Sequence, residues 1–288
     1  MEKRPAQTAV GPTVIVAIDQ HEQCPVQPDG LARRFLPVSA RMLVALTRWR
    51  LIRRWVMNAV DKQMPGMWAS FLCRKRYIDD HLVEAVTGGA EAVVIMGAGL
   101  DTRPYRLPAL AGIKVFEVDL AENIRAKRAL LTKLYGAVPE HVSLVAVDFD
   151  SQDLGETLAR HGYRAAGRTV FVWEGVTMYL TEGGVRATFD FLARAAPGSR
   201  LVFTYLPQDF LDGTTFYDSE PLYQQYKVRR GLWRFGFDPQ RVPEFLAEYG
   251  WRVLEQPTAQ EFTDRYVTPS GRDVLVSALE RSVSAERI

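Results

Sequence analysis

The chain has 288 residues, of which 47% are hydrophobic and 24% are charged, and 36 Lys and Arg residues against 34 Asp and Glu residues give a net charge of +2. This balance excludes disordered, collagen-like and disulfide-rich proteins, and the small net charge argues against a wholly basic nucleic-acid binder. The length suits one large domain or two small ones and is sufficient to bury a substantial core.

The two cysteines, Cys24 and Cys73, are too few for a disulfide framework and form no C-x-x-C pair. We therefore expect a reduced, cytoplasmic setting. No run of apolar residues approaches the roughly 18 that would span a bilayer, and none has the form of a secretory signal.

Taken in chain order, residues 1–30 contain four prolines and two glycines, which predicts a loose N-terminal arm with a short strand at residues 14–18. Over residues 31–87 the apolar positions recur at helical spacing. A Pro-Gly pair at residues 65–66 interrupts them before a further helix over residues 70–86. We expect this region to form a helical lid.

The predicted lid is strongly basic. Between residues 31 and 76, Asp61 is the one acidic residue against eleven basic ones: Arg33, Arg34, Arg41, Arg48, Arg50, Arg53, Arg54, Lys62, Arg74, Lys75 and Arg76. Such a run most often forms a solvated helix face. Two alternatives are attraction of an anionic substrate or phosphate, and a peripheral membrane contact, which would need a clean apolar face.

Beyond residue 88, short apolar runs alternate with helical segments. The predicted strands are residues 92–96, 113–118, 143–147, 169–173 and 200–205, with helices such as 121–135 and 182–195 between them. Strands that are apolar throughout predict a parallel sheet covered on both faces. Residues 251–254 and 273–279 are expected to pair as an antiparallel edge, so that residues 88–288 form a Rossmann-like α/β domain that acts together with the lid as one functional unit.

The first of these strands ends in Gly97-Ala98-Gly99, and the second ends in Asp119. Two glycines directly after a buried strand let the backbone turn tightly and approach a ligand, although a plain strand-to-helix turn would need them too. Asp119 lies 20 residues beyond Gly99, where a carboxylate can accept hydrogen bonds from ribose hydroxyls. Nucleotides bind at this edge of open parallel sheets.

The residues after the glycines indicate which nucleoside binds. A dinucleotide site prefers a third glycine where Thr102 stands, and Asp101 would repel a pyrophosphate. Asp101 would instead attract a sulfonium or an ammonium group. The pattern therefore favours S-adenosylmethionine, a nucleoside with a cationic tail, over NAD.

Several sequence blocks together resemble the leucine carboxyl methyltransferase family, which includes bacterial small-molecule O-methyltransferases. They are residues 74–80 (RKRYIDD), 97–107 (GAGLDTRPYRL), 116–119 (FEVD), 147–149 (VDF), 173–180 (WEGVTMYL) and 197–203 (PGSRLVF). The similarity runs from about residue 28 to residue 280. It implies a class I methyltransferase fold, with a mostly parallel sheet, an antiparallel edge and an N-terminal helical lid.

The resemblance also implies roles for the residues around the glycine loop. Gly97, Ala98 and Gly99 would let the loop pass beneath the cofactor. Asp101 would lie near its charged amino-acid part, and Asp119, with Leu120 beside it, would hold the ribose.

Four further residues take cofactor roles by the same resemblance. Arg74 would pair with the methionine carboxylate, and Glu174 would meet the methionine amino group or face the substrate. Asp148 would accept from the adenine amine, with Phe149 beside the ring. Lys75 departs from the family pattern, in which a small hydroxyl residue is common.

Each of these residues also has a purely structural interpretation. Arg74 would belong to the basic face, Asp148 would cap a turn, and Glu174 would form a structural ion pair. We assign catalytic roles to Glu174 and Tyr205, although Tyr205, like Tyr179, would serve equally as a core aromatic residue.

The expected reaction is transfer of a methyl group to an oxygen nucleophile, in which the protein aligns the reacting atoms and excludes water. The absence of a marked general base fits a carboxylate acceptor slightly better than a hydroxyl. No metal-binding motif is present in the sequence. The aromatic segment 206–241 predicts a wall for a small aromatic or polyketide-like molecule of secondary metabolism, with Arg229 and Arg230 available to an anionic one.

Two other classes of function remain open. One is methylation of a protein C-terminal carboxylate or of an RNA base, and the other is non-catalytic nucleotide binding. The modest net charge argues against nucleic acid as a partner. A homo-oligomer is compatible with the sequence.

Overall fold

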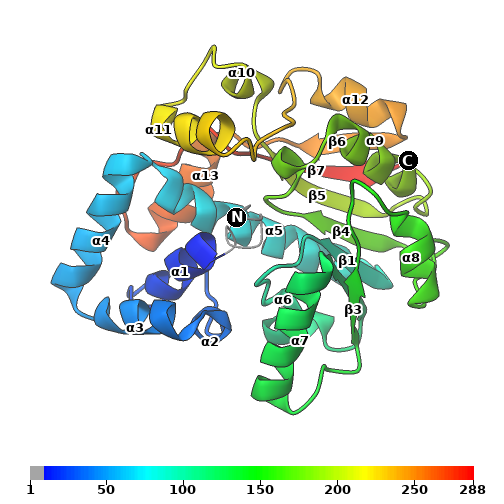
Figure 1. Cartoon of the computed structure of the whole chain (residues 1–288), viewed down its shortest axis with the longest axis horizontal. Helices are drawn as coiled ribbons and strands as arrows, with labels where there is room; N and C mark the ends of the chain where they lie inside the picture. Colours follow the sequence, from blue (N-terminus) through cyan, green and yellow to red (C-terminus); the bar gives the residue numbers. More distant parts are fainter. Residues whose placement is uncertain (1–9) are drawn as a thin grey trace.

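A seven-stranded sheet forms the centre of the computed structural model, which describes residues 10–288 (Figure 1). The strand order is β3-β2-β1-β4-β5-β7-β6. The strands are β1 (Ala92–Met96), β2 (Lys114–Asp119), β3 (Val142–Ala146), β4 (Thr169–Trp173), β5 (Arg200–Tyr205), β6 (Trp251–Glu255) and β7 (Arg281–Arg287). Strands β1 to β5 pair in parallel, and β7 pairs antiparallel with both β5 and β6.

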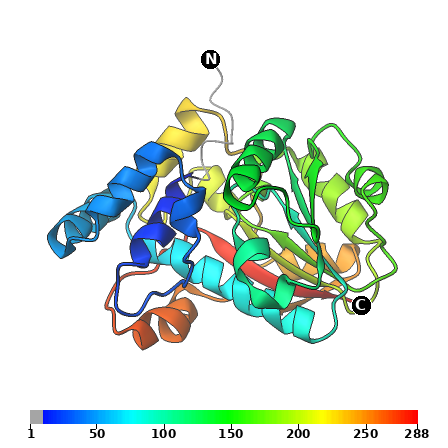
Figure 2. The same ribbon diagram turned by 90° about the horizontal axis from the view of Figure 1, so that it is seen from below.

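Helices cover both faces of the sheet and continue beyond its carboxyl edge (Figures 1 and 2). They are α1 (Val10–Asp19), α2 (Ala32–Phe35), α3 (Val38–Leu46), α4 (Arg50–Gln63), α5 (Met67–Thr87), α6 (Arg103–Arg106), α7 (Ala121–Tyr135), α8 (Leu154–Arg160), α9 (Glu182–Leu192), α10 (Gln208–Leu211), α11 (Glu220–Leu222), α12 (Val242–Glu248) and α13 (Ala259–Phe262). Within residues 10–288, none of these helices is long and apolar enough to cross a membrane.

The alternation along β1 shows how the core is divided. Val93 and Ile95 join the cluster beneath α5 and α7, whereas Val94 and Met96 join the cluster beneath α8 and α9. Successive strand residues point to opposite faces, so both clusters are continuous with the sheet. The continuous apolar strands therefore confirm the predicted parallel sheet, and three of the five predicted spans match the observed strands to the residue.

The N-terminal prediction was wrong for the described residues. Residues 10–19 form helix α1, not a strand in a loose arm, and α1 packs against α2 and α5. Residues 15–18 are buried, and the Asp19 carboxylate accepts from Arg272 at 2.6 Å. Burial of the Val and Ile side chains among other helices overrides their β propensity. Residues 1–9 of the predicted arm lie outside the described part of the chain.

The last predicted strand was also misplaced. Residues 273–279 are irregular, and β7 begins only at Arg281. The Ser277 N–H donates to the Gly66 carbonyl at 3.0 Å, so this segment pairs with the turn before α5 instead of the sheet. The residues of β7 gave little strand signal because only Val283 and Ala285 are apolar, whereas Ser282 and Ser284 are polar although both are buried.

Candidate functional site

A cavity of about 470 Å³ lies at the carboxyl ends of the parallel strands. All ten residues that the sequence assigned to cofactor binding line it: Arg74, Gly97, Ala98, Gly99, Asp101, Asp119, Leu120, Asp148, Phe149 and Glu174. They come from α5 and from the loops after β1, β2, β3 and β4. The fold thus brings together residues separated by 100 positions in the sequence, in a cavity of the size that small ligands occupy.

The glycine loop is held rigidly against β2. The N–H groups of Gly97 and Ala98 both donate to the Val118 carbonyl, at 2.8 and 2.9 Å. Gly97 has a φ of +76°, and a Cβ on it would lie 2.2 Å from Val176 Cγ2. Only glycine suits this position, because both the backbone conformation and the space exclude a side chain.

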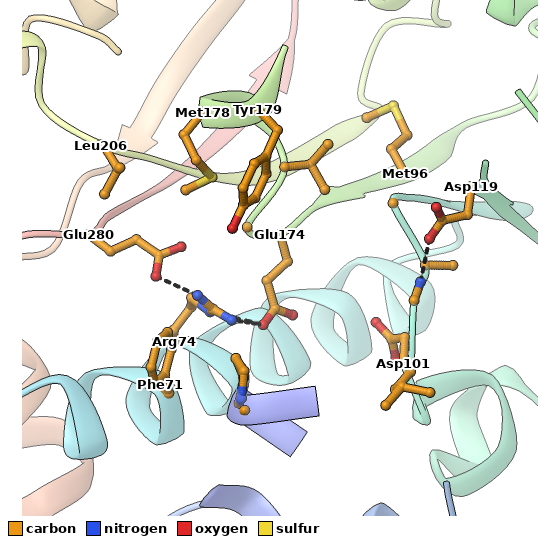
Figure 3. Close-up of a pocket in the computed structure, with 18 of the residues that line it drawn as sticks. Phe71, Arg74, Met96, Asp101, Asp119, Glu174, Met178, Tyr179, Leu206 and Glu280 are labelled. Atoms are coloured by element: carbon orange, nitrogen blue, oxygen red, sulfur yellow. Dashed lines mark hydrogen bonds and ion pairs between the residues drawn. The ribbon is translucent and has the colours of Figure 1, made fainter. Parts of the chain in front are cut away.

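Asp119 closes the loop from the neighbouring strand. Its Oδ2 accepts from the Gly99 N–H at 2.7 Å (Figure 3), and its Oδ1 accepts from the Leu120 N–H and from Asn123 Nδ2 at 2.7 and 2.6 Å. A carboxylate has about four acceptor positions, so Asp119 can still accept from a ligand. Asn123, which the sequence analysis did not single out, lines the cavity beside it.

The turn after β3 holds the next pair of predicted residues. Asp148 Oδ1 accepts from the Asp150 N–H at 3.0 Å, which is the turn-capping role considered from the sequence. Asp148 nevertheless lines the cavity, and its second carboxylate oxygen remains able to accept a further hydrogen bond. Phe149 is buried beside it. Capping and ligand binding are therefore compatible at Asp148.

Glu174 lies at the centre of an ion-pair network (Figure 3). Its Oε1 is 2.7 Å from Arg74 Nη2 and 3.2 Å from Lys75 Nζ, and its Oε2 is 2.8 Å from Arg103 Nη1. Burial alone would raise the pKa of Glu174, but Lys75, Arg74 and Arg103 together lower that pKa well below its usual range. Glu174 is therefore ionised, and Lys75, which departs from the family pattern, serves as one of its cations.

The network extends from Glu174 in two directions. Arg74 also pairs with Glu280, and Arg103 also pairs with Asp101 and Asp79. Further pairs join Arg106 to Asp79 and Asp29. The cations are Arg74, Lys75, Arg103 and Arg106, and the carboxylates are Asp29, Asp79, Asp101, Glu174 and Glu280. Four positive charges against five negative ones leave the network with one net negative charge.

The other half of the cavity is apolar. It is lined by Met64, Met67, Phe71, Met178, Leu206, Leu222, Tyr226, Trp233 and Leu279. The rings of Tyr226 and Trp233 stack with centroids 4.8 Å apart and planes 18° apart. The predicted aromatic wall therefore lines the cavity through these two residues, whereas exposed Arg229 and Arg230 do not line it.

Glu280 lines the cavity next to residues of this apolar half. It follows Leu279, and Thr204 Oγ1 donates to its Oε1 at 2.7 Å. In Figure 3 its carboxylate lies beside Leu206 and Arg74, and the Tyr179 side chain points into the cavity on the side of Glu174. No sequence motif marks Glu280, because it follows an irregular segment.

The position of Tyr205 does not support the catalytic role predicted for it. Its side chain is fully buried, its ring packs against Phe203 and Phe237, and it is not among the cavity-lining residues. Among the described residues its hydroxyl has no hydrogen-bond partner, and burial raises its pKa. Tyr205 is thus a core residue, and Tyr179 is the tyrosine of the pair that faces the cavity.

Comparison with known proteins finds a matching family and several relatives. The model of the leucine carboxyl methyltransferase family matches residues 9–193. Proteins assigned as S-adenosyl-L-methionine-dependent methyltransferases from Mycobacterium marinum and Mycobacterium avium are 34% and 32% identical, over 68% and 65% of this chain. The matches span 66% and 64% of those relatives, slightly less than two thirds of their length.

One solved structure shares the fold over most of both chains. The crystal structure of a protein assigned as a methyltransferase from Thermobifida fusca aligns with a TM-score of 0.60 and 16% identity. The alignment covers 91% of this chain and 96% of the other. Its low identity makes it a comparison of fold alone, and it confirms the expected Rossmann-like architecture.

Proposed function

The chain belongs to the leucine carboxyl methyltransferase family, and from this premise we propose that it transfers the methyl group of S-adenosylmethionine to a hydroxyl oxygen of a small hydrophobic molecule. The observation that carries the proposal is the two-part cavity. Its polar half contains all ten residues predicted to bind the cofactor, and its apolar half is lined by methionine, leucine and aromatic side chains.

The polar half fits the charge of the cofactor. S-adenosylmethionine carries a sulfonium, an ammonium and a carboxylate, and so has one net positive charge. The ion-pair network around Glu174 has one net negative charge, which complements it. The positive charge on the sulfonium makes its methyl group open to attack by an oxygen.

The remaining contacts would come from the strand ends. Asp119 would accept from the ribose hydroxyls, and Asp148 would accept from the adenine amine beside Phe149. The glycine loop would allow close approach, since Gly97 presents backbone and no side chain. Arg74 would bind the methionine carboxylate by sharing the guanidinium that now holds Glu174 and Glu280.

The apolar half supports a hydroxyl acceptor over a carboxylate. Arg74 is already shared by two carboxylates, and Arg234, at the edge of the cavity, ion-pairs with Asp150 at 3.4 Å. Glu280 would repel an anionic acceptor but can accept the hydrogen of a hydroxyl. An acceptor hydroxyl held in this way would be aligned with its lone pair toward the cofactor half, while the apolar walls exclude water.

The same features argue against the other classes of function. A protein C-terminus or an RNA would need uncommitted cations beside the cavity, but the cations that line it are paired. A non-catalytic nucleotide-binding protein would have no need of a separate apolar compartment next to the cofactor half.

Two measurements test the proposal. Calorimetry should show that S-adenosylmethionine binds the wild-type protein and that Asp119→Ala and Asp148→Ala each weaken binding by about 1–3 kcal/mol, as expected when polar partners are lost. A panel of matched phenols and aromatic carboxylic acids, with radiolabelled cofactor, should give methyl ethers and no esters. Unchanged affinity in both variants would refute the cofactor site, and ester products would refute the hydroxyl acceptor.

A further inference from the structure

Helices α3 and α4 and the turn between them present an unusually apolar surface. Of the thirteen large hydrophobic residues that are exposed among residues 10–288, eight belong to this α3–α4 face: Val38, Met42, Leu43, Leu46, Trp49, Leu51, Ile52 and Trp55. Leu51 is 83% exposed and Trp55 is 72% exposed. Exposed apolar residues concentrated in this way mark an interaction site, unlike single ones scattered over a surface.

Helix α4 makes few buried contacts with the rest of the protein. Arg53 is its one buried residue, and Arg53 pairs with Glu22 of the loop after α1 at 2.6 Å. Leu51 and Trp55 are four residues apart and therefore share the side of α4 that faces solvent. Figure 1 shows α4 at the outer edge of the molecule, away from the sheet.

Arginines flank these apolar side chains. Arg50 and Arg54 also lie four residues apart, on the stripe beside Leu51 and Trp55. Within residues 10–288, neither Arg50 nor Arg54 ion-pairs with a carboxylate, and the same holds for exposed Arg33 and Arg34. The α3–α4 face is therefore apolar, and among residues 10–288 no carboxylate forms an ion pair with its Arg50 or Arg54.

Acidic side chains do not offset this charge. Asp61 is the one acidic residue between residues 31 and 76, and its carboxylate accepts from the Gly66 N–H at 2.9 Å. A partner for this face must therefore supply negative charge of its own together with an apolar phase.

Three partners can be distinguished by these properties. In a dimer with a two-fold axis through this face, the arginines of one copy would lie close to the same arginines of the other, and their positive charges would repel. An RNA would supply phosphates but no apolar phase for Leu51 and Trp55. The interface of a bilayer supplies both, because phosphate headgroups bind the arginines and the acyl boundary takes Leu and Trp side chains.

We propose that the α3–α4 face binds the surface of a bilayer that contains anionic phospholipids. The helices would lie in the headgroup layer, since none within residues 10–288 is suited to cross it. The exposed side chains of α3 and α4 thus form the apolar face that a membrane contact by the basic segment requires.

Helix α4 also leads directly into the cavity. Met64, the residue after its end, lines the apolar half together with Met67 at the start of α5. If the proposed function holds, on which this one step rests, a bilayer would be the place from which a lipophilic acceptor reaches the cavity. Binding to the bilayer itself does not depend on that function.

Vesicle flotation without cofactor or acceptor tests the proposal. The full-length protein should bind vesicles of phosphatidylcholine and phosphatidylglycerol at least about tenfold more strongly than vesicles of phosphatidylcholine alone, and high salt should remove the difference. Leu51→Glu/Trp55→Glu should weaken binding by about tenfold or more, as should Arg50→Gln/Arg54→Gln. These side chains lie on the solvent side of α4, so the variants should keep the wild-type melting temperature.

Leu254→Glu provides the matched control, because Leu254 is an exposed leucine on the edge strand β6 and lies outside the α3–α4 face. It should bind like the wild type. Equal binding by the Leu51→Glu/Trp55→Glu variant and the wild type would overturn the proposal. So would a dimer in sedimentation velocity that the same variant dissociates, or RNA binding that the vesicles fail to compete away.

Discussion

Arg74 and Glu174, which the sequence assigned to separate groups of the cofactor, are ion-paired with each other at 2.7 Å. The pair is buried, and further charges hold each partner: Glu280 for Arg74, and Lys75 and Arg103 for Glu174. The cofactor's amino-acid part would therefore enter a site whose charges already satisfy one another. Such a site is pre-organised, and its affinity should depend on the balance of the whole network rather than on one contact.

Removal of one charge from this network should affect both stability and binding. Glu174→Gln leaves Arg74, Lys75 and Arg103 without their common carboxylate, which should cost about 3 kcal/mol of unfolding free energy, as breaking a buried pair does. The variant also removes the net negative charge, so the affinity for S-adenosylmethionine should fall by about tenfold or more. Denaturant unfolding and calorimetry measure the two effects.

Glu182→Gln is the control for that experiment, since Glu182 pairs with Arg186 on the exposed surface of α9. Its effect on unfolding should stay within about 0.5 kcal/mol, with unchanged cofactor affinity. Equal effects of the two variants would show that the network around Glu174 contributes no more than a surface pair.

The glycine loop gives a second prediction. Gly97→Ala should reduce the unfolding free energy by about 2 kcal/mol or more and abolish cofactor binding, because the added methyl group meets Val176 and the backbone has a positive φ. Gly136→Ala separates the two causes, since Gly136 has a φ of +84° and open space around it. If both variants lost the same stability, the contact with Val176 would contribute nothing.

The position of Gly97 in the structure illustrates how much of the site could be predicted from the sequence. Predicted residues at or just beyond the end of a buried strand lie at the rim of the sheet, because the strand ends fix their position. This holds for Gly97, Asp119, Asp148 and Glu174, all of which line one cavity. The family resemblance added Arg74, which belongs to a helix with no comparable local signal.

Other residues could not be placed from local pattern. Glu280 reaches the cavity only because residues 273–279 cross the turn before α5, a contact between distant segments that no periodicity reports. Tyr205 lies at the end of a strand, as Glu174 does, but its side chain is buried in the core. Because side chains alternate between the two faces of a strand, a difference of one residue decides whether a side chain enters the core or the cavity. Helix α1 could not be predicted because its Val- and Ile-rich composition favours a strand, whereas burial against other helices stabilises it as a helix.

Lys127 supports the glycine loop from below, because its ammonium donates to the Ala98 carbonyl at 3.2 Å and also pairs with the buried carboxylate of Glu117. The protonation of Glu117 should therefore make this support sensitive to pH. Burial raises the pKa of Glu117 to about 7, although Lys127 and the Tyr105 hydroxyl oppose the shift. A carboxyl group with a raised folded-state pKa binds its proton more tightly in the folded protein than in the unfolded chain. Its contribution to stability is therefore full below the ordinary pKa of 4.5 and is lost as the pH rises to about 7.

Glu117→Gln isolates this contribution, because the amide keeps the shape of the side chain and cannot ionise. Relative to the variant, the wild type should lose up to about 3 kcal/mol of unfolding free energy between pH 4.5 and pH 7. Denaturant unfolding at several pH values measures the difference. Parallel pH profiles for the two proteins would exclude a raised pKa at Glu117.

Glu280 offers a test of the acceptor class. Glu280→Gln should lower kcat for a hydroxyl acceptor by about tenfold or more, since the carboxylate that accepts the hydroxyl hydrogen is lost. The pH profile of kcat should change as well, which a purely structural role at Arg74 would not cause. If the variant instead methylated carboxylates with a lower KM than the wild type, Glu280 would act by repelling anions.

The stacked pair at the wall of the apolar half gives the last prediction. Trp233→Ala removes a buried ring from Tyr226 and from the cavity, so the KM for an aromatic acceptor should rise by about tenfold while the affinity for S-adenosylmethionine stays unchanged. Val228→Ala is the matched control, because Val228 is exposed on the short helix Tyr223–Arg229 that also carries Tyr226, and it does not line the cavity. Steady-state kinetics and calorimetry together separate the two halves of the site. A loss of cofactor affinity equal to the rise in KM would show that Trp233 supports the whole cavity and not the acceptor half alone.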